Sequence, residues 1–539
     1  MAAVYRKRVV RCAAAPDETT SHSTRLSKSH SQVAGYDGIG MLTRRASGIL
    51  LHPTSLPGAF GTGVFGSDAC KFVDWLARAG QTYWQVLPLG ETGPGNSPYM
   101  SSSAFAGNIL LIDLAELASQ GWLSHDDLKP HPEFRADRVD FALIQPFRME
   151  RLRRAARNFF ANRHDNVFWV YEEFCSAESV WLDDYALFMT IAERENWHEW
   201  NRWPKDLAHR DPKALLSIKM SYPDEIGFWK FCQWCFVRQW SRLKQYANER
   251  GVQIIGDVPI FVAYQSADVW AHQGLFELDE NGRPTVVAGV PPDYFSETGQ
   301  LWGNPLYRWD IHRETGYAWW IARLRHALQL ADLVRIDHFR GFAAYWEVPA
   351  DALNAIAGKW EPGPGEKMFE AFEKIFPQLP IIAEDLGLIT PDVLELRDKF
   401  KLPGMRILQF AFGNGETNHF LPHHYVENTV AYTGTHDNDT SIGWWNSLPD
   451  HEKTFVRHYL GIGSDGDAIN WAMMRALSKS VANTVIFPMQ DVLGLGSEHR
   501  MNFPGKPDGN WEWRFSWDMI KPEHTLALAE MTVEYGRRV

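Results

Sequence analysis

Acidic side chains follow four of the short apolar runs in this sequence. They are Asp257, Asp337, Glu384 and Asp437. One acid in such a position is more often a helix cap or an ion-pair partner. A cluster of like charges costs stability, however, and active sites are where that cost is tolerated. Because carboxyl groups serve as acids, bases and nucleophiles, we interpret the four, with Arg335 and His436 beside them, as one active site.

The apolar runs predict the elements that would position these acids. Eight runs are short, rich in β-branched residues and bounded by polar turns: 48–51, 82–87, 252–255, 332–336, 380–383, 405–410, 429–432 and 484–487. Between them lie segments of helical periodicity, such as the stripe Trp320, Ile321, Leu324, Leu328 and Ala331. Eight buried strands alternating with helices predict an α/β protein of the (β/α)8 TIM-barrel class, with its chemistry at the carboxyl ends of the strands.

Uneven spacing between the runs predicts two insertions in a catalytic barrel that spans 41–539. The longer, a helical subdomain at about 118–247, separates the second and third runs. The shorter, at about 264–310, follows the third run and is rich in turn residues. Because both follow strands, both should sit on the C-terminal face of the barrel and wall one cleft.

Composition excludes several classes of protein. The 539 residues carry 54 Lys and Arg against 66 Asp and Glu, a net charge of −12, which argues against a nucleic-acid partner. No stretch approaches the ~18 apolar residues of a membrane helix, so no membrane partner is expected. Five Cys indicate a reducing compartment. Cys232 and Cys235 lie in an aromatic run and are interpreted as buried helical thiols, with a redox switch as the alternative.

Residues 1–40 differ in composition from the rest of the chain. Six basic residues, two acids and many Ser and Thr fall within the first thirty positions. This composition is typical of an organellar transit peptide, and the segment 9–15 resembles the processing region of algal plastid precursors. We expect a plastid protein, and otherwise a cytoplasmic one with a disordered tail.

The sequence does not support other common catalytic or cofactor-binding motifs. Gly61–Gly66 matches G-x-G-x-x-G but lies ten positions beyond the first run, and the next run ends in Pro88 and Leu89 instead of an acid for a ribose. The sequence has no Walker A, H-E-x-x-H, G-x-S-x-G or EF-hand motif. No metal site is predicted.

Three segments carry a family resemblance. They are Val-Arg-Ile-Asp-His-Phe-Arg-Gly at 334–341, Ala-Glu-Asp-Leu-Gly at 383–387 and Gly-Thr-His-Asp-Asn-Asp-Thr at 434–440. They resemble the catalytic regions of 4-alpha-glucanotransferases, the amylomaltases or disproportionating enzymes. The resemblance runs from about Gly48 to the C-terminus and includes 96–108, 289–305 and 497–505. Pro259, Ile260 and Phe261 replace the Asn-His that the wider amylase superfamily has after Asp257, and the basic tail resembles the plastidial form.

The resemblance implies a role for each acid. Asp337 would be the nucleophile, Glu384 the general acid and base, and Asp437 the transition-state stabiliser, with Asp257 in support. A retaining mechanism needs one carboxylate ionised and one protonated. Arg335 should keep Asp337 ionised, while neighbouring negative charges should raise the pKa of Glu384.

The resemblance also implies how substrate is bound. Donors and acceptors would be α-1,4-glucans, including maltooligosaccharides and glucose, and no cofactor is implied. The substrate-binding residues would be Ser97, Tyr99, Arg335, His338 and His436, with Tyr294, Phe295 and Trp302 on the acceptor side. Two alternatives stay open, an amylase-like hydrolase and a non-catalytic starch-binding protein. The presence of all three catalytic acids disfavours the latter.

Overall fold

The computed structural model describes residues 42–162, 166–292, 296–376, 378–413, 415–463 and 468–538. The predicted transit peptide at 1–40 lies outside these residues. In the described chain no helix is both long and apolar enough to cross a membrane.

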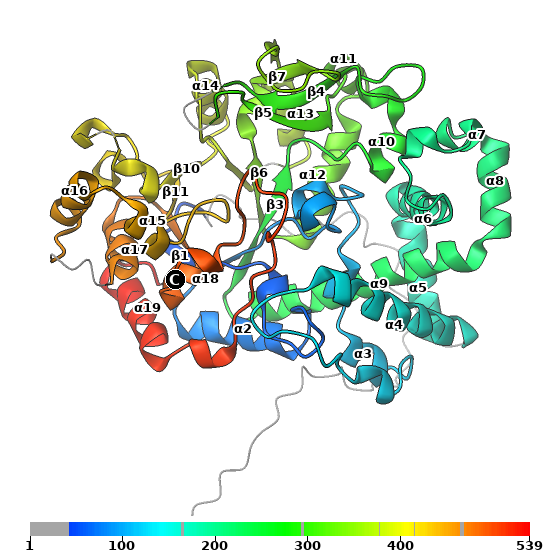
Figure 1. Ribbon diagram of the computed structural model, residues 1–539, viewed down its shortest axis with the longest axis horizontal. Helices are drawn as coiled ribbons and strands as arrows, with labels where there is room; N and C mark the ends of the chain where they lie inside the picture. The colour runs from blue at the N-terminus through cyan, green and yellow to red at the C-terminus, as the bar shows by residue number, and fades with distance from the viewer. Residues whose placement is uncertain are drawn as a thin grey trace, which may run out of the picture.

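Eight parallel strands close into a barrel at the centre of the molecule (Figure 1). Around the barrel the order is β1-β12-β11-β10-β9-β6-β3-β2. Their bounds are β1 Ala46–Leu50, β2 Tyr83–Gln85, β3 Gln253–Pro259, β6 Leu333–Asp337, β9 Ile381–Ala383, β10 Gly404–Ile407, β11 Thr429–Tyr432 and β12 Thr484–Pro488. Each coincides with one of the eight apolar runs, so the predicted TIM barrel is confirmed. The run at 405–410 is strand only to Ile407, after which the chain turns into a 3-10 helix, Leu408–Ala411.

Helices surround the barrel and bury an apolar stripe against it. In α12 (Ala318–Leu330) the predicted stripe is largely correct, since Trp320, Leu324 and Leu328 are buried. The helix α14 (Pro391–Lys399) has Pro391 as its first residue and Thr390 before it, a pair of residue types that is typical of a helix start. The other outer helices are α2 Ser67–Arg78, α10 Ala267–Ala271, α11 Trp309–Glu314, α13 Glu366–Glu373, α15 Ser441–Ser447, α16 Asp450–Leu460, α17 Ile469–Lys479, α18 Met489–Leu493 and α19 Pro522–Glu534.

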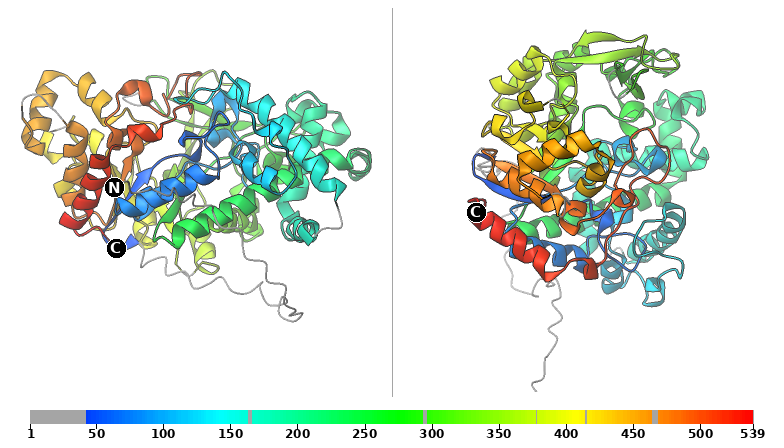
Figure 2. Two further views of the ribbon diagram at one scale, coloured as in Figure 1. Left: turned by 90° about the horizontal axis from the view of Figure 1, so that it is seen from below. Right: turned by 60° about the vertical axis from the view of Figure 1, so that its left-hand side comes forward.

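The chain between β2 and β3 is helical and gathers on one side of the molecule (Figures 1 and 2). Its helices are α3 Leu114–Ser119, α4 Phe141–Ala161, α5 Asn166–Ala177, α6 Ser179–Arg194, α7 Lys205–Ala208, α8 Pro212–Ser221 and α9 Pro223–Asn248. The longest, α9, packs on α4 and α6 and also on α2 and β3, so it joins these helices to the barrel. Cys232 and Cys235 are free, fully buried thiols on α9, as predicted.

A second, antiparallel sheet covers another part of the barrel mouth (Figure 1). Its order is β5-β4-β7-β8, formed by β5 Gln300–Pro305, β4 Val286–Val290, β7 Ala344–Pro349 and β8 Lys359–Pro362. Two of these strands, β4 and β5, fall in the turn-rich segment 264–310, which the sequence predicts to be a loop insertion. Glycines and prolines punctuate this segment, and that pattern hides two short strands, which pair with each other and, through β4, with the distant strand β7.

Candidate active site

Asp337 and Glu384 come from neighbouring strands of the barrel. Asp337 is the last residue of β6, and Glu384 directly follows β9. The two strands pair in parallel with Ile336 opposite Ala383. The next residue on each strand is therefore an acid, and neighbouring strands lie only ~4.8 Å apart. This register brings two carboxyl groups together at the mouth of the barrel.

Arg335 ties Asp337 to Asp257. Arg335 and Asp337 point to the same face of β6 because side chains alternate along a strand, and Asp257 is opposite Arg335 in β3. The guanidinium contacts an Asp257 carboxylate oxygen at 2.7 Å and Asp337 Oδ1 at 2.6 Å. The Asp257 side chain is completely buried, whereas the Asp337 side chain is 31% exposed. Asp337 thus has a fixed positive partner and an open path to a ligand.

Glu384 occupies a different environment from that of Asp337. It is buried, and its carboxyl oxygens accept hydrogen bonds from the backbone N–H groups of His338 at 2.7 Å and Leu386 at 3.0 Å. Burial and, second, the charge of Asp337 raise the pKa of Glu384 to about 8. The expected direction of this shift is correct, but burial contributes more than the neighbouring charge. Near neutral pH the pair therefore offers a proton donor beside Arg335-paired Asp337.

His338 is held in a backbone conformation that serves Glu384. Its φ of 56° is left-handed, which is uncommon for a residue other than glycine, and it turns the His338 N–H toward Glu384. The imidazole lies edge-on to Trp302, with ring centroids 4.8 Å apart. Burial lowers the pKa of His338 to about 4, so the ring is neutral near pH 7. The structure thus brings Trp302 of β5 to the same site.

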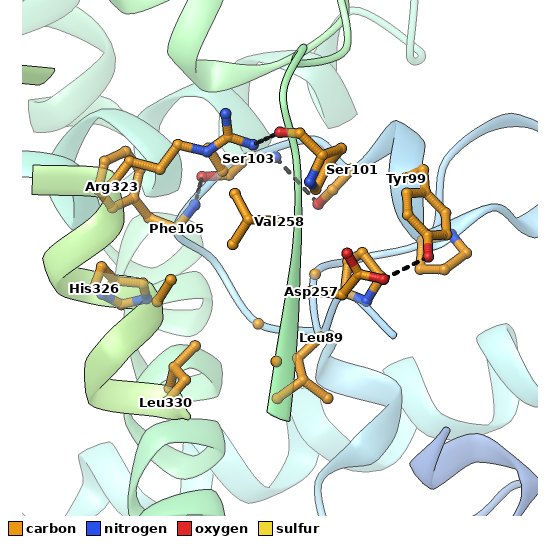
Figure 3. Close-up of a pocket in the computed structure, with 18 of the residues that line it drawn as sticks. Leu89, Tyr99, Ser101, Ser103, Phe105, Asp257, Val258, Arg323, His326 and Leu330 are labelled. Atoms are coloured by element: carbon orange, nitrogen blue, oxygen red, sulfur yellow. Dashed lines mark hydrogen bonds between the residues drawn. The ribbon is translucent and has the colours of Figure 1, made fainter. Parts of the chain in front are cut away.

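Tyr99, His436 and Trp511 form an aromatic wall. The Tyr99 and His436 rings stack with centroids 5.2 Å apart, and Trp511 lies 5.8 Å from each. The Tyr99 hydroxyl donates to Asp257 at 2.8 Å, as Figure 3 shows beside the cavity behind this pair. Ser97 accepts from the Tyr99 N–H and begins the short helix that carries Tyr99. Ser97 therefore contacts the Tyr99 backbone, and no described contact shows it directed at a ligand.

Asp437 reaches the site by a longer connection. It lies five residues beyond β11, and its side chain is 48% exposed. His436 Nε2 is 3.4 Å from its carboxylate, and Asn502 Nδ2 donates to it at 2.7 Å. Arg500 donates to the Asp437 carbonyl at 2.8 Å. Asp437 is thus connected to the other acids through His436 and Tyr99.

Two of the expected substrate-binding residues, Tyr294 and Phe295, lie outside the described residues. Within the described ranges no group of three or more His, Cys, Asp or Glu side chains is arranged to hold a metal ion. Asn502, Trp511 and the Leu386 N–H also belong to this site and were not predicted from the sequence. The segment 497–505 was noted as part of the resemblance, and that signal could have pointed to Asn502. A backbone donor such as Leu386 has no signature in side-chain type.

Comparisons with known proteins agree with this geometry. A model of the 4-alpha-glucanotransferase family matches residues 51–520. The chain is 52% identical to the 4-alpha-glucanotransferase of Thermus thermophilus, over 90% of this chain and 98% of that protein. It is 44% identical to the chloroplastic/amyloplastic 4-alpha-glucanotransferase of Arabidopsis thaliana, over 92% and 86%.

A solved structure is similar over the same range. The amylomaltase of Streptococcus agalactiae, determined in complex with acarbose, superposes with a TM-score of 0.89 at 39% identity and covers 92% of this chain and all of that one. These matches identify a barrel enzyme that acts on glycosidic bonds. The chain belongs to the 4-alpha-glucanotransferase family.

Proposed function

We propose that the protein transfers segments of α-1,4-glucans between maltooligosaccharides through a covalent glucosyl-enzyme intermediate, with Asp337 as nucleophile. The observation that carries the proposal is the contrast between two adjacent carboxyl groups. Asp337 is paired with Arg335, whereas Glu384 is buried and has a pKa of about 8. A retaining mechanism needs this pair, one carboxylate to attack and one acid to protonate.

In the first step an Asp337 oxygen bonds to the anomeric carbon of the donor. The bond from that carbon to the glycosidic oxygen breaks, and Glu384 gives its proton to this leaving oxygen. In the second step the 4-hydroxyl of an acceptor glucan attacks the anomeric carbon, Glu384 takes the hydroxyl proton, and the bond to Asp337 breaks. Two inversions retain the α configuration.

The remaining candidates bind substrate in this proposal. The Tyr99 and His436 stack would hold the sugar that is transferred, and Asp437 would stabilise positive charge on its ring in the transition state. His338 and Trp302 would contact the acceptor, together with Tyr294 and Phe295. An acceptor sugar held there would occupy the space from which water could attack.

Incubation with maltotriose tests the proposal. A transferase should yield glucose together with oligosaccharides longer than maltotriose, and the activity should survive a chelator. Glucose and maltose with nothing longer than the substrate would instead assign the protein as an amylase-like hydrolase. Binding of maltotriose without any product would assign it as a starch-binding protein.

We also propose that residues 1–40 direct the protein to the plastid stroma. Their basic, hydroxyl-rich composition supports this, and two plant relatives are named chloroplastic/amyloplastic. A fluorescent fusion of the full chain should enter plastids, while a fusion that begins at residue 41 should stay in the cytosol and keep its activity. Cytosolic fluorescence of the full-length fusion would contradict the proposal.

A further inference from the structure

A second hollow lies away from the candidate catalytic acids. It is a groove of about 940 Å³ between α6 and the residues that follow α7 on one side and α10, α11 and α12 on the other. Asp337, Glu384 and Asp437 are not among the residues that line it. Its volume lies at the upper end of the range for small-molecule sites, so a short oligosaccharide would fit.

One face of α12 forms a wall of the groove. Ala318, Ala322, Arg325 and Gln329 line it at intervals of three and four residues, the spacing of one helical face. The two alanines leave room, and the two longer side chains are exposed and carry hydrogen-bonding groups. His209 is exposed on the opposite wall. The walls of the groove therefore leave room for a ligand and present hydrogen-bond donors and acceptors to it.

Charges in the groove largely balance. Asp184 and Arg210 form an ion pair at 2.6 Å, and the Glu178 carboxylate accepts a hydrogen bond from the Trp181 indole at 2.6 Å. Burial lowers the pKa of His272, which leaves its imidazole neutral near pH 7. Asp268 and Arg325, which also line the groove, carry opposite charges, so the groove has no large excess of either sign. It suits an uncharged ligand with many hydroxyl groups.

The groove also offers an aromatic surface. Trp181 is half-buried, and its ring stacks on Phe105 at a centroid distance of 6.1 Å. Rings with a polar edge and an apolar face suit ligands that have both kinds of surface, as sugars do. We infer that this groove binds a second α-glucan chain. The ligand class rests on the proposed function, because maltooligosaccharides are the neutral polyhydroxylated molecules that the enzyme would encounter.

The groove contacts the loop that carries Tyr99. Ser103, Phe105 and His326 line the groove on one side and the cavity behind Tyr99 and Asp257 on the other (Figure 3). Asp268, at the groove, accepts a hydrogen bond from the Ala104 N–H at 2.7 Å. A glucan in the groove would thus rest against residues that support the aromatic wall of the active site.

Titration of maltotetraose into full-length Asp337→Asn protein tests the inference, because that variant should bind glucan without turnover. Calorimetry should resolve two sites per chain. Two further pairs of substitutions in the Asp337→Asn protein should each weaken binding at the groove at least tenfold and leave binding at the active site unchanged. Ala318→Leu with Ala322→Leu fills the groove without adding a ring, and His209→Ala with Gln329→Ala removes exposed polar groups.

His198→Ala with Gln245→Ala is the matched control, since it exchanges the same residue types at exposed positions outside the groove. Both sites should persist in it. One site per chain, or a second site that neither groove variant weakens, would overturn the inference. The maltotriose assay on the unaltered protein separates this failure from that of the proposed function. If the protein transfers glucan but has a single binding site, only the inference about the groove is refuted. If it has two sites that respond to the groove variants but does not transfer glucan, the groove is supported and the proposed transferase function is refuted.

Discussion

Two carboxyl groups at adjacent strand ends acquire opposite properties from their surroundings. Asp337 faces the cleft beside a guanidinium, and Glu384 is buried and held by two backbone N–H groups. A buried carboxyl group resists ionisation, whereas a nearby cation favours it. The environment of each residue, and not its type, thus divides the two roles in the proposed mechanism.

Substitution of each acid should separate these roles. Glu384→Gln removes the proton donor, but fluoride leaves without protonation, so α-glucosyl fluoride should label Asp337 in this variant. The step that releases the sugar then lacks its base, and the covalent intermediate should accumulate. Asp337→Asn should form no intermediate with any donor. Mass spectrometry of peptic fragments checks the outcome, and a label on Glu384 or Asp437 would show that the roles are assigned wrongly.

The raised pKa of Glu384 predicts a pH dependence. The acid form is lost as pH rises through about 8, so kcat/KM should fall about tenfold per pH unit above that value. The ordinary pKa of a Glu carboxyl group is 4.5, so between pH 4.5 and about pH 8 the folded protein binds the Glu384 proton more tightly than the unfolded chain does. The contribution of the Glu384 proton to the free energy of unfolding is therefore complete below pH 4.5 and is lost as the pH rises through 8.

Glu384→Gln should remove this part of the stability loss. Thermal denaturation from pH 5 to 9 checks the point, with Glu395→Gln, the same exchange at an exposed position of α14, as control. An unaltered pH profile of stability in Glu384→Gln would contradict the assigned pKa.

The sequence was sufficient to predict the acids but not all of their partners. Asp257, Asp337 and Glu384 follow apolar runs, so their place at the barrel mouth could be predicted from strand geometry. Trp511 and Asn502 lie far along the chain in an irregular segment. Their contacts with Tyr99 and Asp437 depend on where that segment folds back, which no local pattern encodes.

At the scale of elements, a buried acid next to Glu384 joins β9, β10 and α14. Asp385 is buried and accepts hydrogen bonds from the Met405 N–H at 2.6 Å and from Arg397 at 2.5 Å. Gly404 leaves room for this carboxylate, because a Cβ there would lie 2.5 Å from it. Asp385 therefore fixes the end of β9, from which Glu384 projects, and acts as a positioning residue.

Asp385→Asn should lower transfer more than it lowers binding. The amide replaces one acceptor oxygen of Asp385 with an NH2 group, which would then face a hydrogen-bond donor of Met405 or Arg397. The lost hydrogen bond should cost about 1–3 kcal/mol of stability and loosen Glu384. We expect kcat with maltotriose to fall roughly tenfold or more while KM changes little, with a smaller loss in the first step with α-glucosyl fluoride. Asp398→Asn alters the exposed partner of the same Arg397 and should have little effect. Equal losses with both donors would contradict a role through Glu384.

The elements themselves were predicted unequally. All eight barrel strands overlap short, mainly apolar runs, because most of their side chains are buried. Strands β4 and β5 are interrupted by glycines and prolines, and their sheet is completed by β7 and β8 from beyond β6. β4 pairs with β5 nearby in the chain, but its other edge pairs with the distant strand β7, and no local sequence pattern encodes that second pairing.

At the scale of the whole molecule, one apolar core runs through the barrel and into the helices between β2 and β3. Most of the buried apolar residues of the described chain, from Leu42 to Met531, form one large cluster, and α9 contributes to it along much of its length. Trp240 lies in the C-terminal half of this helix and is fully buried. Its indole donates to the Leu330 carbonyl at 2.7 Å and packs on Phe65 with centroids 4.9 Å apart.

Trp240→Ala should therefore weaken barrel and helices together. Removal of a buried Trp leaves a cavity and costs about 3–5 kcal/mol. Because the core is continuous, we expect the far-ultraviolet signal and the catalytic activity to be lost at one, lower denaturant concentration. Trp169→Ala is the matched control: its side chain is 64% exposed, and the change should cost less than about 0.5 kcal/mol. If Trp240→Ala instead left activity intact at denaturant concentrations where much of the helical signal was gone, the helices between β2 and β3 would unfold independently, and α9 would not couple them to the active site.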